Sequence, residues 1–367
     1  MVQRTLYKEM TEENSTNSHL SVAMTTEETD NTHTTGENSM TSSSVGDVTF
    51  YMQCAVIFIG VVGIAGNALI LYALVASKQH KKHALIVNQN ALDLFSSFFL
   101  VITYCVQLSG IHLRLTGAFG YWLCLILLSE NLVWWGTNGS MINLAIITID
   151  RYLKVVHAVW SRKYLRPWVI HTGMAFAWFV GIVYNIIFVY YTTAVIQGRC
   201  LSYAIFPSDV ANMVAIIWYI LFFYVIILVI FIFCYGHILV AIRRQASVMA
   251  SHTSAAGSST GTGTGSSTGT GQTQSQQIQS NVIKTMIIVS AFYAISWLPY
   301  NVYVMLASSL LFPTLIYNAG IFYATTFLAF FYTSANPFIY ATKFDPVRKI
   351  LRKMISYKKT PVQPTSN

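Results

Sequence analysis

The chain carries little charge for its length. Asp, Glu, Lys and Arg together make up 10% of its 367 residues, whereas hydrophobic residues make up 54%. Soluble domains typically contain about 25% charged residues, so this composition argues against a soluble globular protein and predicts a chain that lies largely in lipid. The net charge of +9 is spread over several short segments rather than gathered in one basic stripe, so nucleic acid is not an expected partner.

The sequence also lacks the motifs of zinc sites and of common hydrolases. Its five cysteines show no zinc-site or CxxC spacing. There is no HExxH motif and no pair of aspartates within an apolar run, and the GxSxG pattern occurs only within the low-complexity Gly/Ser/Thr stretch. We therefore predict that the protein is not an enzyme. The first 20 residues contain no apolar run, so a cleaved signal peptide is not expected.

What the chain has instead is a series of long apolar runs. A helix needs roughly 20 apolar residues to cross a bilayer core, and only helices and closed barrels can satisfy their backbone there. None of the runs alternates in the way a barrel strand does. The sequence therefore predicts an all-α membrane protein, a seven-helix bundle within 50–341. The runs are 50–76, 84–109, 122–149, 168–192, 211–241, 282–308 and 318–341.

Basic residues lie mainly on one side of these runs. If the N-terminus is outside the cell, 18 of the 22 Lys and Arg residues fall in the inner loops and the C-terminal tail. Because Lys and Arg concentrate in cytosolic loops, we expect a multi-pass protein of the plasma membrane with an extracellular N-terminus and a cytosolic C-terminus.

Three segments lie outside the predicted bundle. Residues 1–49 are rich in Ser, Thr, Asn and Glu, which predicts a disordered extracellular segment, and Asn14 begins a glycosylation sequon. Residues 242–281 include a Gly/Ser/Thr-rich stretch, which predicts a flexible third inner loop. Residues 342–367 form a cytoplasmic tail that begins with a predicted short amphipathic helix on anionic membrane lipid.

Polar side chains inside the apolar runs are candidates for function, because they are costly in a membrane and usually face the bundle interior. Asp93 is the one carboxylate in the middle of a run, so it needs a cation, a proton or hydrogen-bond donors. Ser140 and Asn336 carry oxygens that suit a small hard cation such as sodium. The other interpretation is a neutral Asp93 that is hydrogen-bonded between helices.

Two prolines interrupt the sixth and seventh runs. Pro299 and Pro337 each remove a backbone hydrogen bond and bend a helix. Trp297 lies half a turn from the first proline, and Tyr340 about one turn beyond the second. A bent helix with a bulky ring beside the bend can act as a hinge. The alternative is static packing, since proline bends are common in membrane helices.

Together, short motifs in these runs resemble those of the rhodopsin-like (class A) G-protein-coupled receptors over about 50–350. Each motif is weak alone, but seven runs that carry all of them in order are specific. The motifs are Gly66-Asn67, NALD ending at Asp93, SxxNLAxITIDRY in the third run, Trp178 in the fourth, FCYGHIL with Tyr235 in the fifth, SWLP in the sixth and NPFIY in the seventh.

This resemblance implies a receptor that binds an extracellular ligand and activates a heterotrimeric G protein when the sixth helix moves outward. Asp150 would hold Arg151 at rest, and the freed Arg151 would meet the G protein. Tyr152, Tyr235 and Tyr340 would belong to the same switch. Arrestin and a receptor kinase are further implied partners. The alternative is a seven-helix transporter or channel, although no internal repeat supports it.

Further residue roles follow from the same resemblance. It implies a disulfide between Cys124 and Cys200, both on the oxidising outer side. It favours sodium at Asp93, Ser140 and Asn336, which is the only cofactor expected. The residues implied for the hinge are Trp297, Pro299, Asn336 and Pro337.

The sequence also departs from the family pattern. Ile227 stands where the fifth helix often has proline, and Tyr293 replaces a common phenylalanine. The third run has two extra residues between its outer cysteine and Arg151, which predicts a bulge near 130–135. At the base of the sixth run, QIQSNVIK offers no carboxylate to Arg151. We hypothesise that this missing ion pair raises basal activity.

The ligand is constrained mainly by exclusion. Receptors for amines need an aspartate in the outer half of the third helix, and retinal opsins need a lysine in the seventh; this chain has neither. An aromatic and amide-rich pocket suits a peptide or a neutral aromatic small molecule. Glu130 is a candidate contact for a basic peptide at the mouth. The candidate pocket residues are Glu130, Val133, Trp134, Trp297, Tyr300 and Asn301.

Overall fold

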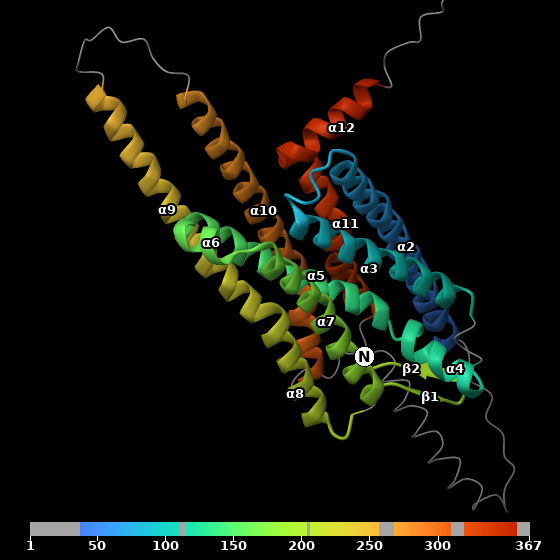
Figure 1. Cartoon of the computed structure of the whole chain (residues 1–367). Coiled ribbons are helices and arrows are strands. Elements are labelled where there is room, and N and C mark those ends of the chain that lie inside the picture. Colours follow the sequence, from blue (N-terminus) through green and yellow to red (C-terminus); the bar gives the residue numbers. More distant parts are fainter. Residues whose placement is uncertain (1–36, 111–114, 204–205, 257–267, 310–318, 358–367) are drawn as a thin grey trace, which may run out of the picture.

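The computed structural model describes residues 37–110, 115–203, 206–256, 268–309 and 319–357. Long helices pack side by side in a bundle, with a two-stranded hairpin at one end and the C-terminal helix α12 at the other (Figure 1). The predicted all-α bundle is confirmed. The glycosylation prediction at Asn14 lies outside the described residues.

The third and fifth membrane spans are each interrupted by a π-turn, and the remaining spans are single helices. In chain order the elements are α2 (Glu37–Ala76), α3 (Ala84–Leu108), α4 (Gly117–Leu123), η2 (Cys124–Leu128), α5 (Asn131–Val156), α6 (Ala158–Tyr164), α7 (Pro167–Thr192), β1 (Ala194–Ile196), β2 (Arg199–Leu201), α8 (Asp209–Ile220), η3 (Leu221–Val225), α9 (Ile226–Ala256), α10 (Thr268–Ser308), α11 (Ala319–Lys343) and α12 (Asp345–Tyr357).

Six helical stretches in the described part of the chain are long and apolar enough to cross a membrane, and α11 completes the bundle. The lower hydropathy of α11 reflects its polar side chains, which are buried among the other helices rather than exposed to lipid. These buried polar residues are Thr325, Thr326, Thr333, Ser334 and Asn336.

Close approach of α5 and α7 depends on glycine. A Cβ atom added to Gly181 on α7 would lie 2.6 Å from the Trp135 carbonyl oxygen and 3.1 Å from the Gly139 nitrogen on α5. Small residues let membrane helices approach backbone to backbone. This contact fixes the central α5, whose outer end carries the pocket and whose inner end carries Asp150 and Arg151.

Two segments differ from the sequence-based expectation. Helix α9 continues to Ala256 and α10 begins at Thr268, so residues 242–256 and 268–281 of the predicted loop are helical. Helix α2 begins at Glu37, inside the segment 1–49 that was expected to be disordered. Both differences have the same cause: once a membrane span has nucleated a helix, each added turn costs little, even in polar sequence.

Candidate functional site

The outer end of the third span is broken immediately before the pocket. Turn η2 is followed by Glu130, whose backbone has left-handed angles of φ 58° and ψ 19°. The irregular backbone is satisfied locally: the Ser129 hydroxyl donates to the Leu125 carbonyl at 2.7 Å, and the Trp134 amide donates to the Glu130 carbonyl at 2.9 Å. The bulge expected near 130–135 therefore exists, but it lies a few residues earlier, at 124–130.

A disulfide joins this break to the second outer loop. Cys124 and Cys200 are bonded, with their Cα atoms 5.4 Å apart, which confirms the predicted pair. Cys200 lies on β2, which pairs antiparallel with β1. The Leu115 amide also donates to the Gly198 carbonyl in the turn of this hairpin at 2.8 Å. The hairpin is thus fixed against the start of the third span.

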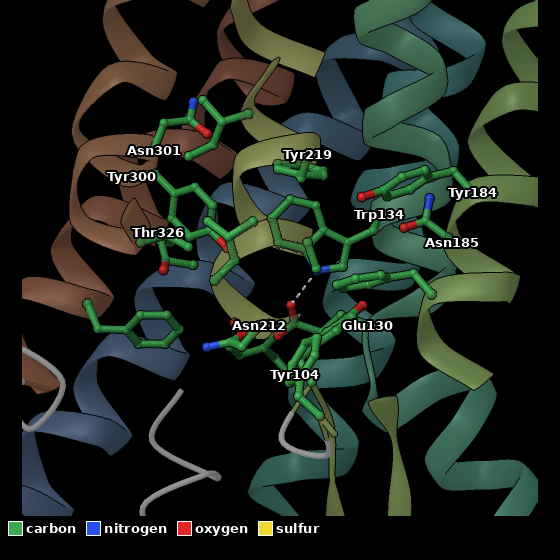
Figure 2. Close-up of a pocket in the computed structure, with 18 residues that line it drawn as sticks. Tyr104, Glu130, Trp134, Tyr184, Asn185, Asn212, Tyr219, Tyr300, Asn301 and Thr326 are labelled. Atoms are coloured by element: carbon green, nitrogen blue, oxygen red, sulfur yellow. Dashed lines mark hydrogen bonds between the residues drawn. The ribbon is translucent and has the colours of Figure 1, made fainter. Parts of the chain in front are cut away.

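Beside the break lies a pocket with aromatic and amide walls (Figure 2). Of the predicted pocket residues, Glu130, Trp134, Tyr300 and Asn301 line it. Val133 and Trp297 do not, because both are buried in the helix packing. Sequence reasoning missed several lining residues, which come from the neighbouring helices and the outer loop: Tyr104, Asn212, Tyr203, Phe206, Phe322 and Thr326.

Glu130 is the only charged residue among the 18 that line the pocket. Its carboxylate accepts a hydrogen bond from the Trp134 indole nitrogen at 3.2 Å, which Figure 2 shows as a dashed line. The Tyr104 hydroxyl also hydrogen-bonds to this carboxylate. Two donors on separate helices therefore hold this carboxylate at the pocket wall, and none of the lining residues that the structure describes is basic.

Trp297 forms the layer beneath the pocket. Its side chain is buried, and its ring lies 5.9 Å from Trp134 and 5.8 Å from Tyr300. Its carbonyl accepts from the Asn301 side chain at 2.9 Å, within the turn that Pro299 interrupts. Through Trp297, the pocket wall is therefore in direct contact with the bend of α10.

Asp93 lies fully buried at the centre of the bundle and is surrounded by donors. Ser140 donates to one carboxylate oxygen at 2.6 Å, and the Asn336 amide nitrogen donates to the other at 2.8 Å. Gln89, which sequence reasoning did not single out, hydrogen-bonds to both Asp93 and Ser140. The structure thus brings the three predicted residues together across α3, α5 and α11.

A chain of hydrogen bonds, all donated in the same direction, leads from Trp178 to Asp93. The Trp178 indole N–H, which can only donate, reaches the Asn88 side-chain oxygen at 2.9 Å. The Asn88 amide then donates to Asn143 at 2.9 Å, and the Asn143 amide donates to Gln89 at 2.8 Å. With a donor-only indole at one end and a carboxylate at the other, every amide in the chain has one possible orientation.

At the inner end of α5, Asp150 is shared between two cations. The Lys154 ammonium lies 2.7 Å from one of its oxygens, whereas the Arg151 Nε lies 3.6 Å away from the other. The Arg151 Nε is buried and makes no hydrogen bond within the described chain. Sequence reasoning missed Lys154, although its position four residues after an acid on a helix signals such a pair.

The other predicted switch residues lie nearby without forming one network. The Tyr235 hydroxyl bridges Thr148 on α5, at 3.1 Å, and Ser290 on α10, at 3.0 Å. Tyr340 is fully buried, and its hydroxyl has no hydrogen-bond partner in the described part of the chain. Tyr152 instead contacts His157, with 3.1 Å between the hydroxyl and Nε2.

A neutral histidine adjoins the inner cluster. His83 is buried just before α3 and packs edge-on against Phe344, with ring centres 5.1 Å apart. Burial, together with the positive charges of Arg151, Lys82 and Lys154, lowers its pKa to about 4. The imidazole is therefore uncharged at neutral pH, and the positive charge around His83 belongs to Arg151, Lys82 and Lys154.

The base of α10 is held by α11 and α12 rather than by an ion pair with α5. The Asn281 side chain donates to Asp345 at 2.5 Å, and the Thr285 hydroxyl donates to the Lys343 carbonyl at 3.1 Å. Within the residues that the structure describes, the ion-pair partner of Arg151 is Asp150. The sequence places no carboxylate near Arg151 on α10, and the base of α10 is instead held by its hydrogen bonds to α11 and α12.

Comparison with known proteins agrees with this architecture. Residues 66–340 match the family described as 7 transmembrane receptor (rhodopsin family). The chain belongs to this family and is a multi-pass membrane receptor of the G-protein-coupled class, not an enzyme. This assignment also replaces the transporter or channel alternative.

The particular relatives are distant. The chain is 24% identical over 322 residues to somatostatin receptor type 5 of Bos taurus, which covers 85% of this chain and 76% of the relative. It is 22% identical over 297 residues to galanin receptor type 1 of Rattus norvegicus, covering 80% and 78%. A crystal structure of squid rhodopsin matches the fold with a TM-score of 0.64 at 18% identity, covering 86% of this chain and 88% of the other.

Proposed function

We propose that this receptor binds an extracellular peptide that carries a basic group, and that it activates a heterotrimeric G protein in response. The observation that carries the ligand proposal is the carboxylate of Glu130, which is the single charged group among the described residues that line the pocket. Relatives that are receptors for the peptides somatostatin and galanin support the peptide class.

The chemistry of the pocket favours a cation over a neutral ligand. Glu130 is partly buried. A carboxylate withdrawn from water without a counter-ion is costly, so a ligand ammonium or guanidinium gains a charge-assisted hydrogen bond there. Tyr104, Tyr203 and Tyr300 add aromatic surface, which attracts cations through the ring faces. A neutral aromatic small molecule would bind the same walls but would leave Glu130 unpaired, which makes it the second candidate ligand.

Signal transfer is proposed to run through α10 to Arg151. With the N-terminus outside, the pocket opens to the exterior, and Trp297 with Pro299 and Pro337 provides the bends about which α10 and α11 move. Outward movement of α10 would leave Arg151 to contact the G protein, steadied by Tyr235 and Tyr340. The 3.6 Å separation between Arg151 and Asp150 and the unpaired Nε support this role, because little needs to break.

The central carboxylate is proposed to hold a sodium ion. Asp93, Ser140 and Asn336 have suitable oxygens, and the Asn336 side-chain oxygen is buried without a partner. The Asn336 amide must rotate for this, because its nitrogen now faces Asp93. When bound, the ion would neutralise the buried carboxylate; a neutral, hydrogen-bonded Asp93 is the alternative.

Further partners are proposed on the cytosolic side. Helix α12 carries basic residues along its length, which suits contact with anionic lipid. Arrestin and a receptor kinase are proposed to act on the Ser- and Thr-rich inner segment, where phosphorylation adds charge.

The test is a cell assay with a promiscuous G protein and an amidated peptide library in which each basic peptide has a neutral counterpart. We expect activation by basic members, abolished by Arg151→Ala at equal surface expression. Glu130→Gln should weaken the active peptide at least tenfold, whereas Glu130→Asp should weaken it less. Asp209→Asn, which removes another outer carboxylate, is the matched control.

Two results would count against these proposals separately. Equal potency of basic peptides and their neutral counterparts would overturn the cationic ligand but leave the receptor function intact. Full signalling by Arg151→Ala would contradict the proposed contact with the G protein.

A further inference from the structure

Two tyrosine hydroxyls connect the fifth and sixth membrane spans in the middle of the bundle. The Tyr293 hydroxyl, on α10, donates to the Phe223 carbonyl in turn η3. In the opposite direction, the Tyr224 hydroxyl, in η3, donates to the Ala294 carbonyl on α10 at 2.8 Å. Both rings are buried, and their centres lie 6.0 Å apart. Two consecutive residues on each side therefore exchange a reciprocal pair of hydrogen bonds.

The acceptor in the fifth span lies within an irregular stretch of backbone. A π-turn interrupts the i→i−4 hydrogen-bond ladder, and here the Ile226 amide bonds back to the Leu221 carbonyl, five residues earlier. In a membrane, backbone groups released by such a turn must find partners on neighbouring helices. The Tyr293 hydroxyl reaches the Phe223 carbonyl within this turn.

The sequence departures from the family pattern meet at this point. The phenylalanine that is common at the position of Tyr293 has no hydroxyl and could not make this bond. Ile227, in place of the frequent proline, is the second residue of α9, which follows the turn. Meanwhile α10 has no carboxylate beside Arg151, and its base is tied to α11 and α12 by Asn281 and Thr285 instead.

We propose that Tyr293 and Tyr224 form a tyrosine latch that positions α10 against the fifth span in the resting receptor. Opening of α10 must break both hydrogen bonds and leave two hydroxyls without partners in an apolar interior, which opposes the movement. The latch therefore takes over the resting restraint that an ion pair between Arg151 and α10 would otherwise provide. The low basal activity that follows is opposite to the hypothesis drawn from the sequence.

The latch can be tested without a ligand. Tyr293→Phe and Tyr224→Phe each remove one hydroxyl and keep the ring. From hydrogen-bond strengths typical between membrane helices, each should raise basal nucleotide exchange on the G protein by roughly threefold, and the double variant by more. Tyr72→Phe, at a lipid-facing ring on α2, is the control and should leave basal exchange unchanged. All values are normalised to surface expression.

A second readout separates the latch from G-protein coupling, since the latch rests on the proposed movement of α10. An environment-sensitive fluorophore is attached at Lys284→Cys, an exposed position on α10, in a background where the free Cys54 and Cys105 are replaced by serine. In purified receptor the emission should shift in the latch variants and not in Tyr72→Phe.

The outcomes are distinct. A fluorescence shift without increased exchange would support the latch and contradict the proposed coupling. Unchanged fluorescence and exchange in both single variants and the double variant would overturn the latch. If Tyr293→Phe does not reach the membrane, Tyr224→Phe alone decides, because each hydrogen bond is predicted to act by itself.

Discussion

The third and fifth spans contain the same local irregularity but resolve it differently. Turn η2 lies at Cys124–Leu128 and turn η3 at Leu221–Val225. In η2 the Leu125 carbonyl is satisfied by Ser129 and Asn131 of the same span, at 2.7 Å and 3.5 Å. In η3 the Phe223 carbonyl is satisfied by Tyr293 of another helix.

This difference assigns the two turns to different tasks. A turn that is satisfied within its own span, and fixed further by a disulfide, is a rigid support for the pocket. A turn that is satisfied by a neighbouring helix makes the position of that helix part of its own hydrogen bonding. Damage to η2 should therefore reduce stability and ligand binding, whereas damage to η3 should change the balance between resting and active receptor.

The largest effect is expected from removing the disulfide that fixes η2. Cys200→Ser should lower the free energy of unfolding by about 2–4 kcal/mol, because the bond closes a long loop between residues 76 apart. The measurement is the thermal stability of purified receptor in detergent. Cys234→Ser, at a buried free cysteine, is the control. A disulfide variant as stable as the wild type would show that η2 does not depend on the hairpin.

The next effect concerns the left-handed backbone of Glu130. A non-glycine residue pays about 1–2 kcal/mol in this conformation, and a β-branched residue fits it worst. Glu130→Gly should therefore be more stable than Glu130→Val by about 2 kcal/mol, measured by thermal unfolding. In the regular part of α5 the order should reverse, so Ile142→Gly should be less stable than Ile142→Val. The same order at both positions would contradict the broken helix.

How much of the fold and of the site could be predicted from the sequence depends on how far apart in the sequence the interacting residues lie. The seven spans follow from the apolar runs, and the meeting of Asp93 with Ser140 and Asn336 follows from their cost in lipid and from the family resemblance. Lys154 was missed although its spacing from Asp150 is local and readable. The Tyr293 contact could not be predicted, because it depends on the rotation of two helices, and that rotation depends on a π-turn without a proline to mark it.

The pocket shows the same limit. Glu130, Trp134, Tyr300 and Asn301 were found because they lie at the outer ends of apolar runs. Val133 was wrongly placed in the lining because the irregular turn before it changes which face of α5 meets the cavity. Asn212 and Tyr203 were missed, since their approach to the pocket depends on how the second outer loop is tied to Cys124.

A smaller effect is expected at Ser129, which closes η2. Ser129→Ala removes its hydrogen bond to the Leu125 carbonyl and should lower the free energy of unfolding by about 1 kcal/mol. Basal nucleotide exchange should not change, because the bond lies within one span. Ser161→Ala, on α6, removes a bond of the same local type as a control. Basal exchange that rises as in Tyr293→Phe would end the distinction between the two turns.

The smallest effect is expected from placing proline directly after η3. Proline inside a helix usually costs about 3 kcal/mol, because it removes an amide that bonds four residues back and its ring crowds that carbonyl. For residue 227 the carbonyl four residues back is that of Phe223, which already accepts from Tyr293. Ile227→Pro should therefore cost less than about 1 kcal/mol in thermal stability, whereas Val229→Pro, two residues further into α9, should cost the full amount.

The tolerance of Ile227→Pro should depend on the Tyr293 hydroxyl. In a Tyr293→Phe background, Ile227→Pro leaves the Phe223 carbonyl without the amide donor and without the hydroxyl donor, and should become clearly destabilising. Equal losses for the two prolines, or equal tolerance with and without the Tyr293 hydroxyl, would show that this carbonyl is not the point at which the fifth and sixth spans are joined.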